Sequence, residues 1–134
     1  MKEIGGFNCI ALHYSVSAAA DLSLHNNFRE YRYITGGNPN APPIFAIEGF
    51  RYTEGSPAKF ARSDVEKPFM SHFFANCGIG IGSPIPAWWN SIIVKVGTFN
   101  KQSLFKPQVA TFICDKLHYH HIHEGLPAYH KKVV

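Results

Sequence analysis

Cysteine is scarce in this sequence of 134 residues, which contains only Cys9, Cys77 and Cys114. An odd number of cysteines at unrelated spacings argues against the disulfide framework of a small secreted protein, so we expect a reducing, cytoplasmic location. No apolar run reaches the length of a membrane span, and the start of the chain lacks the charged and apolar regions of a signal peptide. We therefore expect no membrane partner.

Charge is also limited, because charged residues make up 16% of the chain and the net charge is +4. The basic residues are scattered except at His130-Lys131-Lys132, and without a basic stripe we expect no nucleic-acid partner. Aromatic residues, by contrast, make up 14% and include 11 phenylalanines. This apolar bulk is enough for a core without disulfides, and the length predicts a single domain over 1–134.

Helical patterns are few, and most of the chain consists of short runs rich in β-branched and aromatic residues between Gly and Pro turns. One short helix is expected over 26–34, with Asn27 as its N-cap and Glu30 as the return arm of a capping box. The Gly, Asn and Pro residues of 35–43 should end it. The pattern predicts a mainly β protein of packed antiparallel sheets with little helix. The expected strands are 5–16 (after a glycine turn), 44–50, 51–53, 59–62, 69–74, 91–96, 108–113 and 117–122.

The segment 72–82 is similar to a zinc knuckle that has lost half of its metal chemistry. In a knuckle, two cysteines three positions apart flank a tight turn, and a glycine follows the second. Here Phe74 stands at the first cysteine position, whereas Cys77-Gly78 keeps the second half. Gly78, Gly80 and Gly82 lack the spacing and the lysine of a phosphate loop, so we expect close backbone packing there.

The order of the motifs along the chain carries a family resemblance. The chain resembles the glutathione-dependent formaldehyde-activating enzymes, a family that also includes centromere protein V. The resemblance implies a β-tent fold with a zinc-ribbon-like ancestry. The matching motifs are Gly6-Phe7-Asn8-Cys9, Asn26-Asn27-Phe28-Arg29-Glu30-Tyr31-Arg32 with Gly36, Phe73-Phe74-Ala75-Asn76-Cys77-Gly78, Lys106-Pro107-Gln108 and Gly125-Leu126-Pro127.

The resemblance also implies two zinc ions and shows which of their ligands this chain has lost. The structural zinc of the family takes four cysteines, whose positions correspond to Phe7, Cys9, Phe74 and Cys77, so two ligands remain. The catalytic zinc takes three cysteines, and none remains. The positions that match those three cysteines are Asn26, Phe28 and Tyr31.

We expect no cofactor, with aromatic packing in place of the structural metal. Because a structural zinc contributes about 10–16 kcal/mol and a buried phenylalanine only about 1.5–3 kcal/mol, the wider core must supply the difference. The alternative is a zinc with substituted ligands, in which His13 or His72 joins Cys9 and Cys77. In either case Cys9 and Cys77 should lie close together, because both derive from one metal centre.

Two other clusters have open interpretations. The expected strand 117–122 would place His118 and His120 on one face and His121 and His123 on the other. This pattern fits a solvated edge strand, or a metal site formed by two histidines. Trp88 and Trp89 fit a core position, a pocket wall or a subunit contact, so a homo-oligomer remains an alternative.

Two classes of function follow from the resemblance. The first is a non-catalytic binding or interaction module whose cleft takes a small thiol or a thiol adduct such as S-hydroxymethylglutathione. The second is a carbon–sulfur lyase, with Tyr31 and the nearby His25 as acid and base in place of the zinc Lewis acid. Because Asn26, Phe28 and Tyr31 offer no thiolate, the sequence favours the non-catalytic module.

Overall fold

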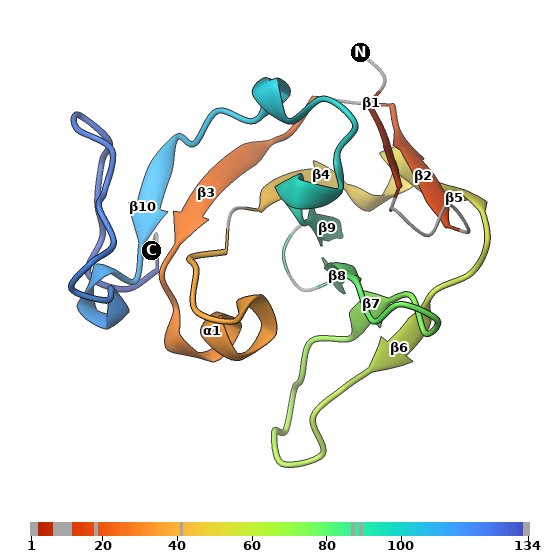
Figure 1. The fold of residues 1–134 in the computed structure, drawn as a ribbon, viewed down its shortest axis with the longest axis horizontal. Helices are drawn as coiled ribbons and strands as arrows, with labels where there is room; N and C mark the ends of the chain where they lie inside the picture. Colours follow the sequence, from red (N-terminus) through yellow and green to blue (C-terminus); the bar gives the residue numbers. More distant parts are fainter. Residues whose placement is uncertain are drawn as a thin grey trace.

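The computed structural model describes residues 3–6, 12–17, 19–40, 42–86, 88 and 90–132, and these form a mainly β structure. A three-stranded sheet has the order β1-β2-β5, and a seven-stranded sheet has the order β10-β3-β4-β9-β8-β7-β6 (Figure 1). The predicted fold class is therefore confirmed. The strands of the small sheet are β1 (Glu3–Gly6), β2 (His13–Val16) and β5 (Phe50–Glu54). Those of the large sheet are β3 (Leu22–Asn26), β4 (Pro43–Ala46), β6 (Ala58–Phe60), β7 (Ser71–Phe73), β8 (Gly80–Ile85), β9 (Ser91–Val94) and β10 (Val109–Thr111).

Among the described residues, the strands of both sheets pair antiparallel, as predicted, except at one edge of the large sheet. There β10 runs parallel to β3, with Val109 opposite Leu24 and Thr111 opposite Asn26. Parallel neighbours need a long connection rather than a hairpin. Here the connection from β3 to β10 contains strands β4 to β9 and, last, the short 3-10 helices η2 (Val96–Thr98) and η3 (Gln102–Leu104).

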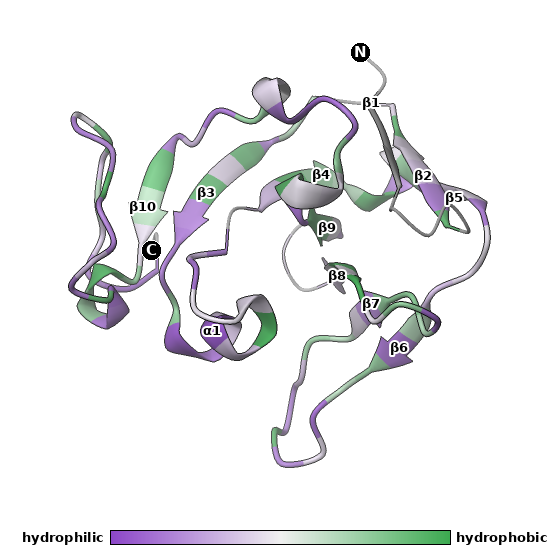
Figure 2. Cartoon of the chain, viewed as in Figure 1, coloured by the Kyte–Doolittle hydropathy of each residue, from purple (hydrophilic) through white to green (hydrophobic). Residues whose placement is uncertain are grey.

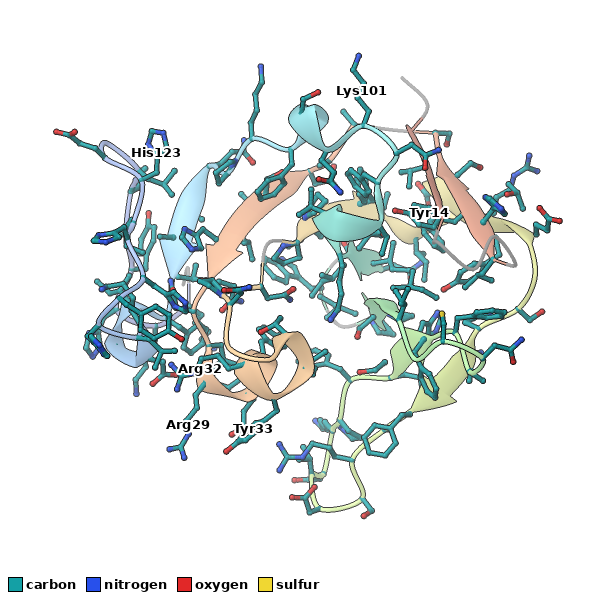
Figure 3. All side chains as sticks on the ribbon, viewed as in Figure 1. Tyr14, Arg29, Arg32, Tyr33, Lys101 and His123 are labelled. Atoms are coloured by element: carbon teal, nitrogen blue, oxygen red, sulfur yellow. The ribbon has the colours of Figure 1, made fainter. Side chains whose placement is uncertain are left out.

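The core lies in two clusters. The first, here called the main core, joins the small sheet to β4, β8 and β9, and Tyr14 is fully buried within it (Figure 3). The second joins Leu24, Ile44, Ile85 and Ile93 on the large sheet. Hydrophobic residues alternate with polar ones along several of these strands (Figure 2), as expected for strands that bury one face. The buried members of the main core are Leu12, Tyr14, Val16, Phe45, Ile81, Ile92, Val94 and Phe99.

The helix forms later in the chain than predicted and without the expected cap. Helix α1 spans Arg29–Thr35, Phe28 occupies the N-cap position, and no side chain caps it. Asn27 instead uses its side-chain amide to donate to the carbonyl of Thr111, which ties the start of the helix to β10. The predicted end is correct, because Gly36 takes the left-handed conformation, with φ of 79°, that glycine adopts readily.

The predicted strand over 117–122 is wrong, and with it the assignment of its histidines to two faces. After the 3-10 helix η4 (Ile113–Asp115) the backbone makes turns, and the His120 N–H donates to the carbonyl of Leu117. The Lys116 ammonium donates to the carbonyls of both Leu117 and His120. Local hydrogen bonds at 117–120 thus take the backbone groups that a strand would have offered to a neighbour.

The remaining 3-10 helix, η1, spans Ile47–Gly49 and lies between β4 and β5.

Candidate functional site

A cavity of about 1070 Å³ lies between α1, the connection from β6 to β7, and a floor made by β7, β8 and β9. Figure 1 shows α1 and the β6–β7 connection on the same side of the large sheet, apart from the small sheet. Strands β8 and β9 contribute to both the main core and the cavity, since Ile81, Ile92 and Val94 enter the main core while their neighbours Gly80, Gly82 and Ile93 line the cavity. Its floor includes Ser71, Phe73, Gly80, Gly82, Ser83, Ile93 and Lys95.

Two glycines of β8 shape the floor. A Cβ at Gly82 would lie 1.9 Å from the carbonyl oxygen of Ile93, so only glycine allows β8 to approach β9 here. A Cβ at Gly80 would instead lie 3.2 Å from both Cε and Nζ of Lys95. The predicted close backbone packing is therefore confirmed at Gly82. At Gly80 the missing side chain makes room for the end of Lys95.

The wall opposite the floor contains two of the three positions that the resemblance assigns to catalytic zinc ligands. Phe28 and Tyr31 both line the cavity, and their rings meet edge to face with centroids 5.4 Å apart. Asn26 is buried, and its side-chain oxygen accepts the N–H of Phe28 at 2.9 Å. A phenyl ring, a phenol and an engaged amide do not fit a zinc ion that needs thiolate or imidazole ligands.

Charge at the cavity is predominantly positive. Arg62 reaches from the β6–β7 connection to Glu30 of α1, with Nη1 and Oε2 2.8 Å apart, and it also pairs with Asp64. The Asp64 partner raises the pKa of Arg62 and the Arg62 partner lowers the pKa of Asp64, so both stay charged. Lys67 and Lys95 add two more basic side chains to the lining. Among the described lining residues Glu30 is the one acid, and Arg62 already engages it.

The outer rim of the cavity exposes large apolar side chains. Tyr33 is 73% exposed, and Figure 3 shows it projecting from α1 on the same side as Arg29. Ile34 lies beside it, and Phe60 and Phe69 face from the β6–β7 side. A monomer rarely gathers such residues around one hollow unless they contact a ligand or partner.

A sequence profile of the family described as glutathione-dependent formaldehyde-activating enzyme matches residues 3–115. The chain belongs to this family. A structural-genomics crystal structure of a Rhodobacter sphaeroides protein superimposes with a TM-score of 0.54 at 12% identity, covering 96% of this chain and 99% of that one. At that identity the likeness shows the fold alone. Comparison with curated protein sequences gives no significant match. In the described part of the chain no helix is long and apolar enough to cross a membrane.

A tight turn is present at 74–78, where the sequence is similar to a zinc knuckle. The Gly78 N–H donates to the carbonyl of Phe74 at 2.7 Å, and Gly78 has a φ of 74°. Phe74 packs against the main core, whereas Cys77 is exposed. Phe7 and Cys9 lie outside the described residues, so the proximity of Cys9 to Cys77 stays a prediction. Among the described residues no three His, Cys, Asp or Glu side chains gather as a metal site.

The two histidines considered as substitute ligands have other partners. His13 lies 3.7 Å from the carboxylate of Glu54 on the small sheet. His72 is buried, and its Nδ1 lies 2.7 Å from the Tyr52 hydroxyl. Burial raises the pKa of Tyr52, so the phenol keeps its proton, and its hydroxyl and Nδ1 share a hydrogen bond. That bond occupies one of the two nitrogens with which His72 could have bound a metal.

The other predicted site residues are divided between the cavity and the core. Burial raises the pKa of Tyr31, so its phenol remains protonated at the cavity wall. His25 is not among the residues that line the cavity, and burial followed by the charge of His120 lowers its pKa. Trp88 packs against the second core cluster rather than lining the cavity, and Trp89 lies outside the described residues.

Sequence reasoning missed Lys95 altogether. Burial lowers the pKa of this lysine, which lines the cavity floor. The available signal was a charged residue directly after the apolar run Ile92-Ile93-Val94. Such a position is unusual because a lysine that faces a partly buried surface loses hydration.

We expect stability to fall as pH drops below about 6.5, the ordinary histidine pKa. Burial, with the charge of Lys59, lowers the pKa of His72 in the folded protein. The unfolded state therefore takes up a proton on this residue more readily, so its contribution is fully present above pH 6.5 and is lost as pH falls through the lower folded value. Urea unfolding between pH 7.5 and 5 measures this fall in the free energy of unfolding.

His72→Gln should reduce that pH dependence, and the exposed His130→Gln is the matched control. A decline of the same steepness in the wild type and the His72→Gln variant would contradict the assignment.

Proposed function

We propose that the protein is a non-catalytic small-molecule-binding member of the family, with a small thiol or a thiol adduct as its ligand. The observation that carries the proposal is that Phe28 and Tyr31, at the positions matching catalytic zinc ligands, line a cavity of about 1070 Å³. A volume of this order suits a small organic ligand. The side chains at those positions supply aromatic surface in place of a metal.

The lining suits a ligand with an apolar part and a negative charge. Phe28, Tyr31 and Phe73 offer aromatic surface, and Arg62 offers a cation. Thioethers pack favourably on aromatic rings, and carboxylates bind ammonium and guanidinium groups. S-hydroxymethylglutathione, the adduct that the family resemblance implies, combines both features.

The donor set argues against lyase activity as the primary function. A Lewis acid would need ligands that Asn26, Phe28 and Tyr31 do not supply. Acid–base chemistry would need a base near Tyr31, yet His25 does not line the cavity. The alternative of a carbon–sulfur lyase therefore has one candidate acid, Tyr31, without the predicted base beside it.

We expect the purified protein to bind S-methylglutathione, a stable thiol adduct, without accelerating S-hydroxymethylglutathione formation from glutathione and formaldehyde. Calorimetry measures the binding, and NMR exchange spectroscopy measures the rate, with and without added zinc. Tyr31→Ala removes a cavity wall and should weaken binding about tenfold, which corresponds to about 1.4 kcal/mol. Tyr129→Ala, a tyrosine that does not line this cavity, should change nothing.

A clear rate enhancement over the spontaneous reaction would overturn the non-catalytic assignment. If Tyr31→Phe or His25→Ala abolished that enhancement, acid–base catalysis would replace the non-catalytic assignment. No saturable binding of either S-methylglutathione or glutathione would reject the ligand class.

A further inference from the structure

Lys95 is held in a fixed place by its backbone. Its N–H donates to the carbonyl of Ile81 at 2.8 Å, and its own carbonyl accepts the Thr98 hydroxyl at 2.7 Å. These bonds join the residue to β8 on one side and to η2 on the other. The side chain then extends across Gly80, where its Cε and Nζ each lie 3.2 Å from the position that a Cβ would take. The amine is therefore positioned along the cavity floor rather than in open solvent.

The surroundings of the amine make its protonated form less favourable than it is in water. Burial lowers its pKa, and Arg62 and Lys67 are further cations on the lining. Among the described residues no ion pair involves the Lys95 ammonium, and the carboxylate of Glu30 is engaged by Arg62. The other titratable groups that line the cavity are Tyr31 and Tyr33 of α1 and His72 of β7. None of these is a carboxylate that could form an ion pair with the amine.

We propose that the Lys95 amine is a nucleophile that captures small aldehydes with an apolar substituent as a reversible imine. The proposal rests on the cavity being a ligand site, as proposed above, and adds a second class of ligand. The amine nitrogen attacks the carbonyl carbon, the C=O bond is replaced by a C=N bond, and the oxygen leaves as water with both hydrogens of the amine. The step needs no oxidant or metal, and water reverses it.

The geometry favours imine formation over the simple binding of an anion by a charged lysine. A lysine that binds anions is most useful when it is protonated and hydrated at a surface, whereas a desolvated lysine in an apolar pocket is activated as a nucleophile. The aromatic rings of Phe28 and Phe73 offer a surface for the substituent of the aldehyde. Tyr31 keeps its proton and lies on the same cavity, so a hydrogen-bond donor is available for the departing oxygen.

The test is reductive trapping with benzaldehyde and cyanoborohydride at pH 7, followed by peptide mapping in a mass spectrometer. We expect Lys95 to carry about tenfold more label than the exposed Lys59, because loss of hydration makes the partly buried amine give up its proton more readily and react as a nucleophile. Lys95→Arg should remove the preferred label, and the matched control Lys59→Arg, at a residue that does not line the cavity, should leave it in place. Labelling of Lys95 should also remain strong at pH values where labelling of the surface lysines has almost ceased.

Equal labelling of all lysines, or a pH profile for Lys95 that coincides with the surface profile, would overturn the proposal. The label distribution on the unaltered protein decides this even if Lys95→Arg fails to fold. The two proposals fail separately. Binding of S-methylglutathione without selective labelling rejects the nucleophile alone, and selective labelling without binding of any thiol adduct rejects the proposed function alone.

Discussion

Replacing Gly82 with alanine should destabilise the protein by about 3 kcal/mol or more, the upper end of the range for overpacked sites. The added methyl group would lie 1.9 Å from the carbonyl oxygen of Ile93 and 2.9 Å from its carbonyl carbon. Because both atoms are backbone, no side-chain rotation relieves the overlap, and β8 must move away from β9. Urea denaturation followed by circular dichroism measures the loss.

Gly97→Ala is the matched control, since no heavy atom lies within 4 Å of the added carbon. It should change the free energy of unfolding by less than about 0.5 kcal/mol. If Gly82→Ala were as stable as Gly97→Ala, the close approach of β8 to β9 would be wrong, and the cavity floor with it.

Tyr14→Ala should cost about 3–5 kcal/mol, as large-to-small changes of buried aromatic residues do. The tyrosine is fully buried, stacks on Phe50 with ring centroids 5.3 Å apart, and packs near Phe99. Its hydroxyl lies 2.7 Å from the Thr98 hydroxyl. Thermal or urea unfolding gives the magnitude.

Tyr14→Phe separates the ring from the hydroxyl. The Thr98 hydroxyl donates its proton to the carbonyl of Lys95, so Tyr14 is the donor in the tyrosine–threonine bond. Removing that donor should cost only about 1 kcal/mol, the net value of one hydrogen bond. Equal losses for Tyr14→Phe and Tyr14→Ala would contradict the packing argument, because they would place the whole effect in the hydroxyl.

The strands rich in β-branched residues could be predicted from the sequence, but two strands within the large sheet could not. β8 contains two glycines and a proline, which locally indicate a turn, yet it forms a strand because Gly82 fits against the backbone of β9. β3 contains serine, histidine and asparagine, which have low strand propensity. Its polar groups have distant partners, such as the side-chain oxygen of Gln108 for the Ser23 N–H. In both cases, contacts with residues distant in the sequence, rather than local sequence preference, make the segment a strand.

The candidate site was predictable on one side only. The order of the motifs located Phe28 and Tyr31, and the structure places both on the cavity wall. The floor was not predictable, because Lys95 reaches the cavity only when β7, β8 and β9 pair and Gly80 leaves room for its side chain. Local spacing describes residues on one element, whereas this floor combines three.

The hydrogen bonds that join early and late segments have a consequence for how the chain folds during synthesis. The hydrogen-bond partner of Tyr14 is Thr98 and that of Asn27 is Thr111, and each partner is synthesised 84 residues later. At about 5–20 residues per second, the ribosome needs several seconds to supply those partners. Such distant pairing also gives a high contact order, which is typical of domains that fold in milliseconds to seconds. The apolar faces of β2 and β3 therefore stay partly uncovered until β8 and β9 have been synthesised, and the nascent chain is most prone to aggregate in that interval.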